Sequence, residues 1–202
     1  MLNSITTNFP DVQRSIERLH EGVRGAALTS AINKTLDQAK TAMVRGITAE
    51  FNVKAAYVRE RLRVVRASKK GGLFSIEGSL RGGSDRKRSA NIIGFVERSV
   101  SLAQAKRRRK DGTLNQLFVK VKRIGSSKPL KGAFIGNKGR TVFRRTGKAR
   151  LPIEPVQVID VGQMFNTRRI NAVVVATLKA KFAAVFEREA RFYTNRFNRG
   201  NN

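Results

Sequence analysis

Apolar residues recur every three or four positions at both ends of the chain. The first such stretch begins at Val12, is interrupted at residues 22–25, and continues as far as Ile47. This spacing collects apolar side chains on one face of an α-helix. We therefore expect helix over about residues 10–51, with a break between two helices where two glycines interrupt the pattern.

Two further helices are expected. The first covers residues 54–65, where apolar residues fall at steps of four and three. The second covers residues 161–197, where one apolar stripe indicates a long amphipathic helix. Asp160 and Gln163 have the spacing of a capping box, in which each side chain satisfies backbone N–H groups at the helix start. Residues 198–202 are expected to fray.

The middle of the chain consists of short apolar runs separated by turn residues. These runs predict strands over residues 73–80, 90–96 and 117–124, and the last of them alternates with a period of two. Glycine and aspartate predict turns or loops at residues 82–85 and 110–112.

Two more extended segments follow. Residues 130–136 and 140–144 are expected to pair as a hairpin around the turn Asn137-Lys138-Gly139. Valines after Pro155 indicate an extended edge over residues 156–161.

The order of elements is helices, then an antiparallel sheet, then a helix, which predicts the α+β class. A length of 202 residues fits one domain. Within it we distinguish a helical N-terminal part over residues 1–70, a basic sheet part over 71–160, and a C-terminal helix over 161–197.

Charge separates the middle of the chain from both ends. The chain carries 42 Lys and Arg against 14 Asp and Glu, a formal net charge of +28. Residues 54–150 hold net +23 of this, whereas residues 1–53 hold +1 and residues 151–202 hold +4. This localised surplus predicts a surface that meets a partner of opposite sign, such as nucleic acid or an acidic protein.

No catalytic or metal-binding constellation is apparent. Cysteine is absent, which excludes disulfides and thiolate metal sites. The single histidine, His20, is expected on a surface helix without a catalytic partner. The carboxylates do not converge as a divalent cation requires, and Glu187 and Glu189 point to different helix faces. We expect no enzymatic activity, no metal and no cofactor.

No membrane partner is expected either. The sequence has no apolar run of 18 residues, and its first ten residues lack the pattern of a secretory signal.

The basic residues gather in three clusters, which are candidate contacts for a polyanion. They comprise Lys106, Arg107, Arg108, Arg109 and Lys110; Arg86, Lys87 and Arg88; and Arg61, Arg63 and Arg66, with Arg59, Lys69 and Lys70 beside them. Such a surface would bind DNA without sequence preference and would lose affinity steeply with salt, because each phosphate contact releases counterions. Phe118 and Phe143 are expected to be core or sheet residues rather than base-stacking platforms.

A sequence-reading DNA-binding module is the weaker hypothesis. Residues 41–65 resemble a helix-turn-helix in the spacing of Ala42 and Gly46 and in an arginine-rich second helix. Asn52, however, stands where the second helix needs a buried apolar residue. This mismatch favours nonspecific binding over operator binding.

One run of residues resembles a known family. Lys131-Gly132-Ala133-Phe134-Ile135, followed by residues 144–153, is similar to the pattern "GAFI … R-x-GK-x-R-x-PI" of the phage minor tail protein Z family, whose type members are the lambda-type tail-completion proteins. The residues that carry the pattern are Gly132, Ala133, Phe134, Arg145, Gly147, Lys148, Arg150 and Pro152. We expect them mainly to support the fold, with Phe134 anchoring a strand in the core.

Further likenesses to the family lie outside this run. Ala31-Ile32-Asn33 is similar to a segment of the family's first long helix, and residues 54–67 are similar to its basic second helix. Residues 106–110 resemble its arginine-rich loop. The resemblance spans about residues 20–190, although residues 71–84 do not align.

The resemblance implies a structural virion protein without catalytic residues, assembled in the host cytoplasm and located at the head–tail junction. Such proteins complete the tail at its head-proximal end and join it to the filled head, near the end of the packaged DNA. The partners implied are tail terminator, tube and connector proteins, and a homo-oligomeric ring, with a hexamer favoured. Six copies would carry on the order of +170 before screening, so a ring would need an anionic partner. Nonspecific binding of DNA or structured RNA is the alternative.

Overall fold

The computed structural model describes residues 16–17, 19–68, 78–82, 89–98 and 116–200. The chain forms two compact units. Unit 1 comprises residues 1–46, 59–82 and 165–202, and unit 2 comprises residues 47–58 and 83–164. The two long helices lie mainly in unit 1 and most of the strands lie in unit 2, which confirms the α+β class. The single domain predicted from the sequence stays a prediction.

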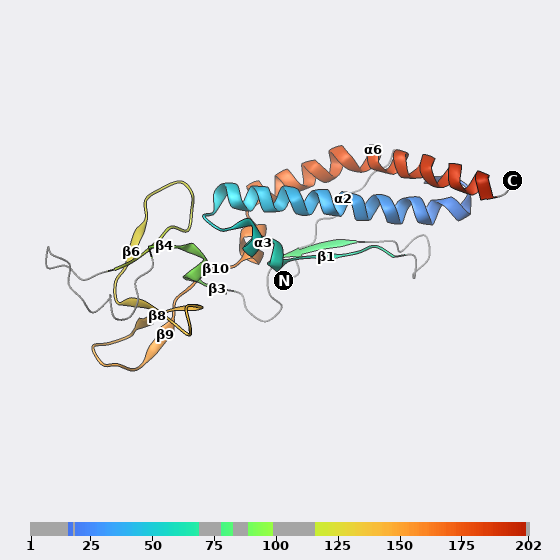
Figure 1. Cartoon of the computed structure of the whole chain (residues 1–202). Helices are drawn as coiled ribbons and strands as arrows, with labels where there is room; N and C mark the ends of the chain where they lie inside the picture. The colour runs from blue at the N-terminus through green and yellow to red at the C-terminus, as the bar shows by residue number, and fades with distance from the viewer. Residues whose placement is uncertain (1–15, 18, 69–77, 83–88, 99–115, 201–202) are drawn as a thin grey trace. The chain divides into compact units, whose positions relative to one another are not determined.

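Two long antiparallel helices form the centre of unit 1. Helix α2 (Glu21–Glu50) and helix α6 (Arg168–Gly200) lie side by side along their length (Figure 1). Their apolar stripes meet in a core made of Val23, Ala27, Ala31, Phe182, Val185 and Phe186. The stripe that the sequence predicts on the C-terminal helix is therefore its buried face. Because α6 is helical as far as Gly200, the expected fraying of residues 198–200 is wrong.

The break expected at residues 22–25 is also wrong, because α2 continues through both glycines. The helix starts after His20, whose carbonyl accepts hydrogen bonds from the N–H groups of Val23 and Arg24. The Nδ1 atom of His20 accepts a third bond, from the N–H of Gly22, at 3.2 Å. The histidine ring also lies against Phe197, with 4.5 Å between ring centroids. His20 is thus an N-cap with an aromatic contact rather than a residue within a helix.

The second predicted helix ends early. Helix α3 (Ala55–Arg61) is followed directly by strand β1 (Leu62–Val65), which pairs antiparallel with β2 (Ser79–Gly82). Leu62 and Leu80 are buried, and pairing satisfies the backbone of a segment that ends in β-branched valines. The helical spacing of residues 62–65 is therefore overridden by strand pairing. The predicted strand over residues 73–80 lies largely outside the described residues.

An asparagine side chain fastens the chain after β1 to helix α2. The Oδ1 atom of Asn33 accepts the N–H of Ala67 at 2.8 Å, and its Nδ2 donates to the carbonyl of the same residue at 3.2 Å. The amide thus pairs with the backbone of Ala67 through two hydrogen bonds, as a residue of a neighbouring β-strand would. This contact gives a structural reason for Asn33 in the Ala-Ile-Asn segment.

Unit 2 consists of small antiparallel sheets. The structure contains β3 (Ser89–Asn91), β4 (Val96–Arg98), β5 (Leu117–Val119), β6 (Lys128–Leu130), β7 (Ala133–Gly136), β8 (Thr141–Arg145), β9 (Ile153–Pro155) and β10 (Gln157–Ile159). The sheet orders are β10-β3, β4-β5-β6 and β7-β8-β9. The predicted hairpin over residues 130–144 is confirmed by β7 and β8.

Three other predictions for unit 2 hold in part. A 3₁₀ helix, η3 (Ile92–Phe95), interrupts the strand expected over residues 90–96. The strand expected over residues 117–124 ends at Val119, after which only an isolated bridge between Phe51 and Lys122 continues the pairing. The extended edge ends at β10, because helix α5 (Val161–Phe165) begins at Val161.

One of the two hydrogen bonds of the capping box predicted at Asp160 is confirmed. The Oε1 atom of Gln163 accepts the N–H of Asp160 at 3.0 Å, as the capping box requires. The helix that it starts is the short α5, and α6 begins separately at Arg168.

A second asparagine organises unit 2. The Oδ1 atom of Asn91 accepts the N–H of Val142 at 2.8 Å, and its Nδ2 donates to the Val142 carbonyl at 3.0 Å. Oδ1 also accepts the N–H of Ile93 at 3.1 Å and so caps η3. One side chain therefore ties β3 and η3 to β8. The buried residues of unit 2 include Phe51, Val58, Ile92, Phe95, Leu117 and Val142.

Candidate partner-binding surface

Two of the three predicted basic clusters lie outside the described residues. These are residues 86–88 and residues 106–110, and their role as polyanion contacts stays a prediction. The third cluster, at the end of α3 and in β1, is described.

Arginines of the third cluster already contact acidic side chains of this chain. Arg66 donates two hydrogen bonds to the carboxylate of Asp37 on α2, at 3.0 and 3.1 Å. Arg61 lies 3.8 Å from Glu60, and Arg63 stands opposite Arg81 in the β1–β2 pair. This pair places two like charges opposite each other, which is unfavourable. It also concentrates positive charge on the sheet.

The family-like motif folds as the three-stranded sheet β7-β8-β9. Asn137, Lys138 and Gly139 all have positive φ, at 51°, 52° and 85°, and together they form the turn between β7 and β8. Gly132, at φ 70°, turns the chain into β7. Glycine adopts these angles without the steric cost that a side chain brings.

The aromatic residues of the motif lie on the outer side of this sheet. Ala133 and Val142 are its buried residues, whereas Phe134 and Phe143 are half-buried. The expectation that Phe134 anchors a strand in the core is therefore wrong, because Phe134 points to the opposite face of β7 from the buried Ala133. The two phenylalanines are direct cross-strand partners, with ring centroids 6.1 Å apart.

Strand register places further residues on this same face. Arg145 is two residues after Phe143, and it pairs with Ile153 of β9. The guanidinium of Arg145 lies 5.7 Å from the centre of the Phe134 ring, within the range of a cation–π contact. We call Phe134, Phe143, Arg145 and Ile153 the motif face. Gly136 leaves room for it, because a Cβ there would lie 3.1 Å from the Phe143 ring.

The loop between β8 and β9 adds exposed residues beside the motif face. Thr146 donates through both its N–H and its hydroxyl to the carbonyl of Pro152, which closes the loop. Gly147, Lys148 and Arg150 are exposed within it, and Leu151 is 66% exposed. The peptide bond between Leu151 and Pro152 is cis.

The segment of sequence that contains this region is strongly basic. Residues 116–155 contain eleven lysines and arginines and a single carboxylate, Glu154. Aromatic residues and arginine are enriched where proteins bind each other, and the motif face contains both. Phe143 lies in β8, as expected of a core or sheet residue, and the period-two placement of Phe143 and Arg145 in this strand puts both on the motif face.

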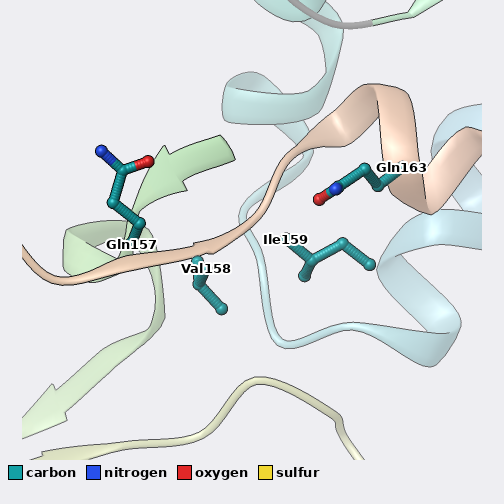
Figure 2. Close-up of a pocket in the computed structure, with 4 residues that line it drawn as sticks. All are labelled: Gln157, Val158, Ile159 and Gln163. Atoms are coloured by element: carbon teal, nitrogen blue, oxygen red, sulfur yellow. The ribbon is translucent and has the colours of Figure 1, made fainter. Parts of the chain in front are cut away.

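A separate hollow in unit 2 has a different character. Gln157, Val158 and Ile159 of β10 and Gln163 of α5 line an open depression of about 480 Å³ (Figure 2). Its four lining side chains are uncharged. It therefore offers no charged group to a charged partner.

The described part of the chain contains neither a metal site nor a membrane-spanning helix. No three histidine, aspartate or glutamate residues come together there as metal ligands would. None of the helices described has both the length and the apolarity needed to span a membrane.

Comparison with known proteins identifies a family. The model of the family described as prophage minor tail protein Z matches residues 11–196. No curated protein and no solved structure matches the chain significantly.

Proposed function

Because the chain belongs to the prophage minor tail protein Z family, we propose that it completes the tail at its head-proximal end and joins it to the filled head. The chain is a structural phage tail protein, located in the virion. We propose further that it acts without catalysis, as a homo-oligomeric ring in contact with other tail and neck proteins.

The observation that carries this proposal is the positive charge of residues 116–155, the segment that contains the motif face. This segment has eleven lysines and arginines and one carboxylate, so copies of the chain that meet through it repel each other. An acidic neighbour neutralises that repulsion, and the exposed apolar residues give the contact its specificity. A junction between tail and head offers two such neighbours, acidic ring proteins and the end of the packaged DNA.

The test is a joining assay with tails assembled in the absence of this chain. We expect such tails to fail to join filled heads, and purified wild-type chain to restore joining. A chain carrying Phe134→Ser and Arg145→Ser should restore it poorly, because these substitutions remove the aromatic and cationic groups of the motif face. Joining without any added chain would contradict the proposal.

Nonspecific nucleic-acid binding is the second candidate, and the same surplus of cations favours it. It predicts tight binding to duplex DNA, with an affinity that falls steeply with salt. Neutralising Lys106 to Lys110 should reduce the salt slope by about one unit for each phosphate that the variant no longer neutralises. No binding to duplex DNA at low salt would exclude this candidate and leave the tail role intact.

A further inference from the structure

A second surface feature of unit 2 is lined by none of the residues of the motif face. It is an open recess of about 480 Å³ formed by the end of α2, the start of α3, η3 and the segment after β5. Its floor includes the buried residues Val53 and Phe95, and the exposed cations Lys54 and Arg123 belong to its lining. We call it the Lys54–Arg123 recess.

The backbone holds this recess in shape. The N–H of Arg123 donates to the carbonyl of Glu50, and the N–H of Asn52 donates to the carbonyl of Val121, both at 2.9 Å. The N–H of Lys120 donates to the carbonyl of Phe95 at 3.0 Å. One segment is thus bonded to α2 and to η3, so the recess exists before any partner arrives.

The acidic residues around the recess are already engaged. Glu50 lies 3.9 Å from the ammonium of Lys122. Glu97 accepts hydrogen bonds from the side chains of Asn52 and Ser127. Among the described carboxylates, none forms an ion pair with Lys54 or Arg123. These two cations therefore remain available to an anion from outside.

The residue after Arg123 adds an apolar contact. Ile124 is 90% exposed, the largest exposure among the large apolar residues described. Burying such a side chain in a partner is favourable in proportion to the apolar area that leaves water. A hydrated phosphate backbone offers it no apolar surface, whereas a protein does.

From these features we propose that the Lys54–Arg123 recess and Ile124 form a docking site for an acidic protein of the tail or neck. A glutamate or aspartate of that partner enters the recess and gives its carboxylate to the two cations. Ile124 enters an apolar hollow on the partner. The inference rests on the proposed function, because it assigns the partner to the same junction.

The experiment measures binding of the full-length chain to tails assembled without it, by cosedimentation. The test variants are Lys54→Ala/Arg123→Ala and Ile124→Asp. The control is Lys179→Ala/Lys181→Ala, which removes the same charge from exposed positions of α6. All the substituted side chains are exposed, so the thermal midpoint should stay at the wild-type value.

We expect the control to bind like the wild type. Each test variant should bind at least about tenfold more weakly, because it lacks either the charge-assisted hydrogen bonds or the apolar side chain that the partner buries. Equal binding of all variants would overturn the docking site and leave the proposed function standing. Absence of binding by the wild type would contradict both. Displacement of the bound chain by excess short DNA duplex would overturn the assignment of an acidic protein in favour of nucleic acid.

A second measurement does not depend on tails. Amide NMR shifts of the full chain are followed during addition of a glutamate-rich peptide, with a glutamine-rich peptide as control. We expect the glutamate peptide alone to shift Asn52, Gly94 and Arg123. Equal shifts with both peptides, or shifts confined to residues 131–150, would contradict the inference.

Discussion

The ammonium of Lys34 on α2 lies 2.7 Å from a carboxylate oxygen of Glu189 on α6. Glu189 is only 3% exposed, and it also accepts a hydrogen bond from the hydroxyl of Ser30 at 2.8 Å. Arg188 contacts its other oxygen at 3.3 Å. One buried carboxylate on α6 therefore joins two side chains of α2 and favours one register of the two long helices.

Removing the cation should cost more than neutralising the anion. In Lys34→Met the carboxylate stays buried with weaker compensation, so we expect a loss of about 2–3 kcal/mol in the free energy of unfolding. Glu189→Gln keeps an acceptor for Ser30 and should lose about 1 kcal/mol. Urea unfolding followed by circular dichroism of the helices measures both. Equal losses would contradict the buried-charge account.

The same carboxylate predicts sensitivity to acid. Burial raises the pKa of Glu189, but hydrogen bonds from Lys34, Ser30 and Arg188 outweigh burial and hold it below its ordinary value of 4.5. A lowered folded-state pKa adds stability above the unfolded pKa, and this stability is lost as pH falls through the folded pKa. Wild type should therefore lose stability below about pH 4.5, and Glu189→Gln should lose less. An unchanged pH profile in that variant would contradict the assignment.

The two asparagine amides should be costly to remove. Asn33→Ala leaves the backbone of Ala67 without either partner, and Asn91→Ala does the same to Val142. We expect losses of about 1–3 kcal/mol for each, because buried backbone groups are left unsatisfied. Hydrogen exchange should report them separately, with faster exchange at Ala67 in one variant and at Val142 in the other. Wild-type exchange at both amides would refute these bridging roles.

The β7–β8 turn and the β8–β9 loop each offer one glycine of a matched pair. Gly139 has φ of +85°, whereas Gly147 has no neighbouring atom within 4 Å of an added Cβ and no positive φ. Gly139→Ala should destabilise unit 2 by about 1 kcal/mol, because an L-residue is strained there. Gly147→Ala should be neutral within a few tenths. Thermal unfolding of the two variants makes the comparison, and equal midpoints would exclude strain at the turn.

The sequence predicted the elements whose signal is local. Helical spacing identified α2 and α6, turn residues identified the β7–β8 hairpin, and the distance from Asp160 to Gln163 identified a helix start. The same spacing correctly put Glu187 and Glu189 on different faces, since their side chains are 63% and 4% exposed.

Features set by distant contacts could not be predicted in this way. Residues 62–65 have helical spacing but form β1, because pairing with β2 decides their conformation. Phe134 is a large apolar residue of the kind usually found in a core, yet its position in β7 places it on the outer face of the sheet. Glu189 looks like any surface glutamate until α2 brings Lys34 and Ser30 to it. The Lys54–Arg123 recess joins residues from segments that are far apart in the sequence, and no local pattern marks it.

The most direct test of the account is the position of this chain in the assembled particle. Electron microscopy of virions carrying a label on the chain locates it without any assumption about its partners. The account predicts label at the head-proximal end of the tail, in contact with the neck. Label found only at the distal tip of the tail would contradict it.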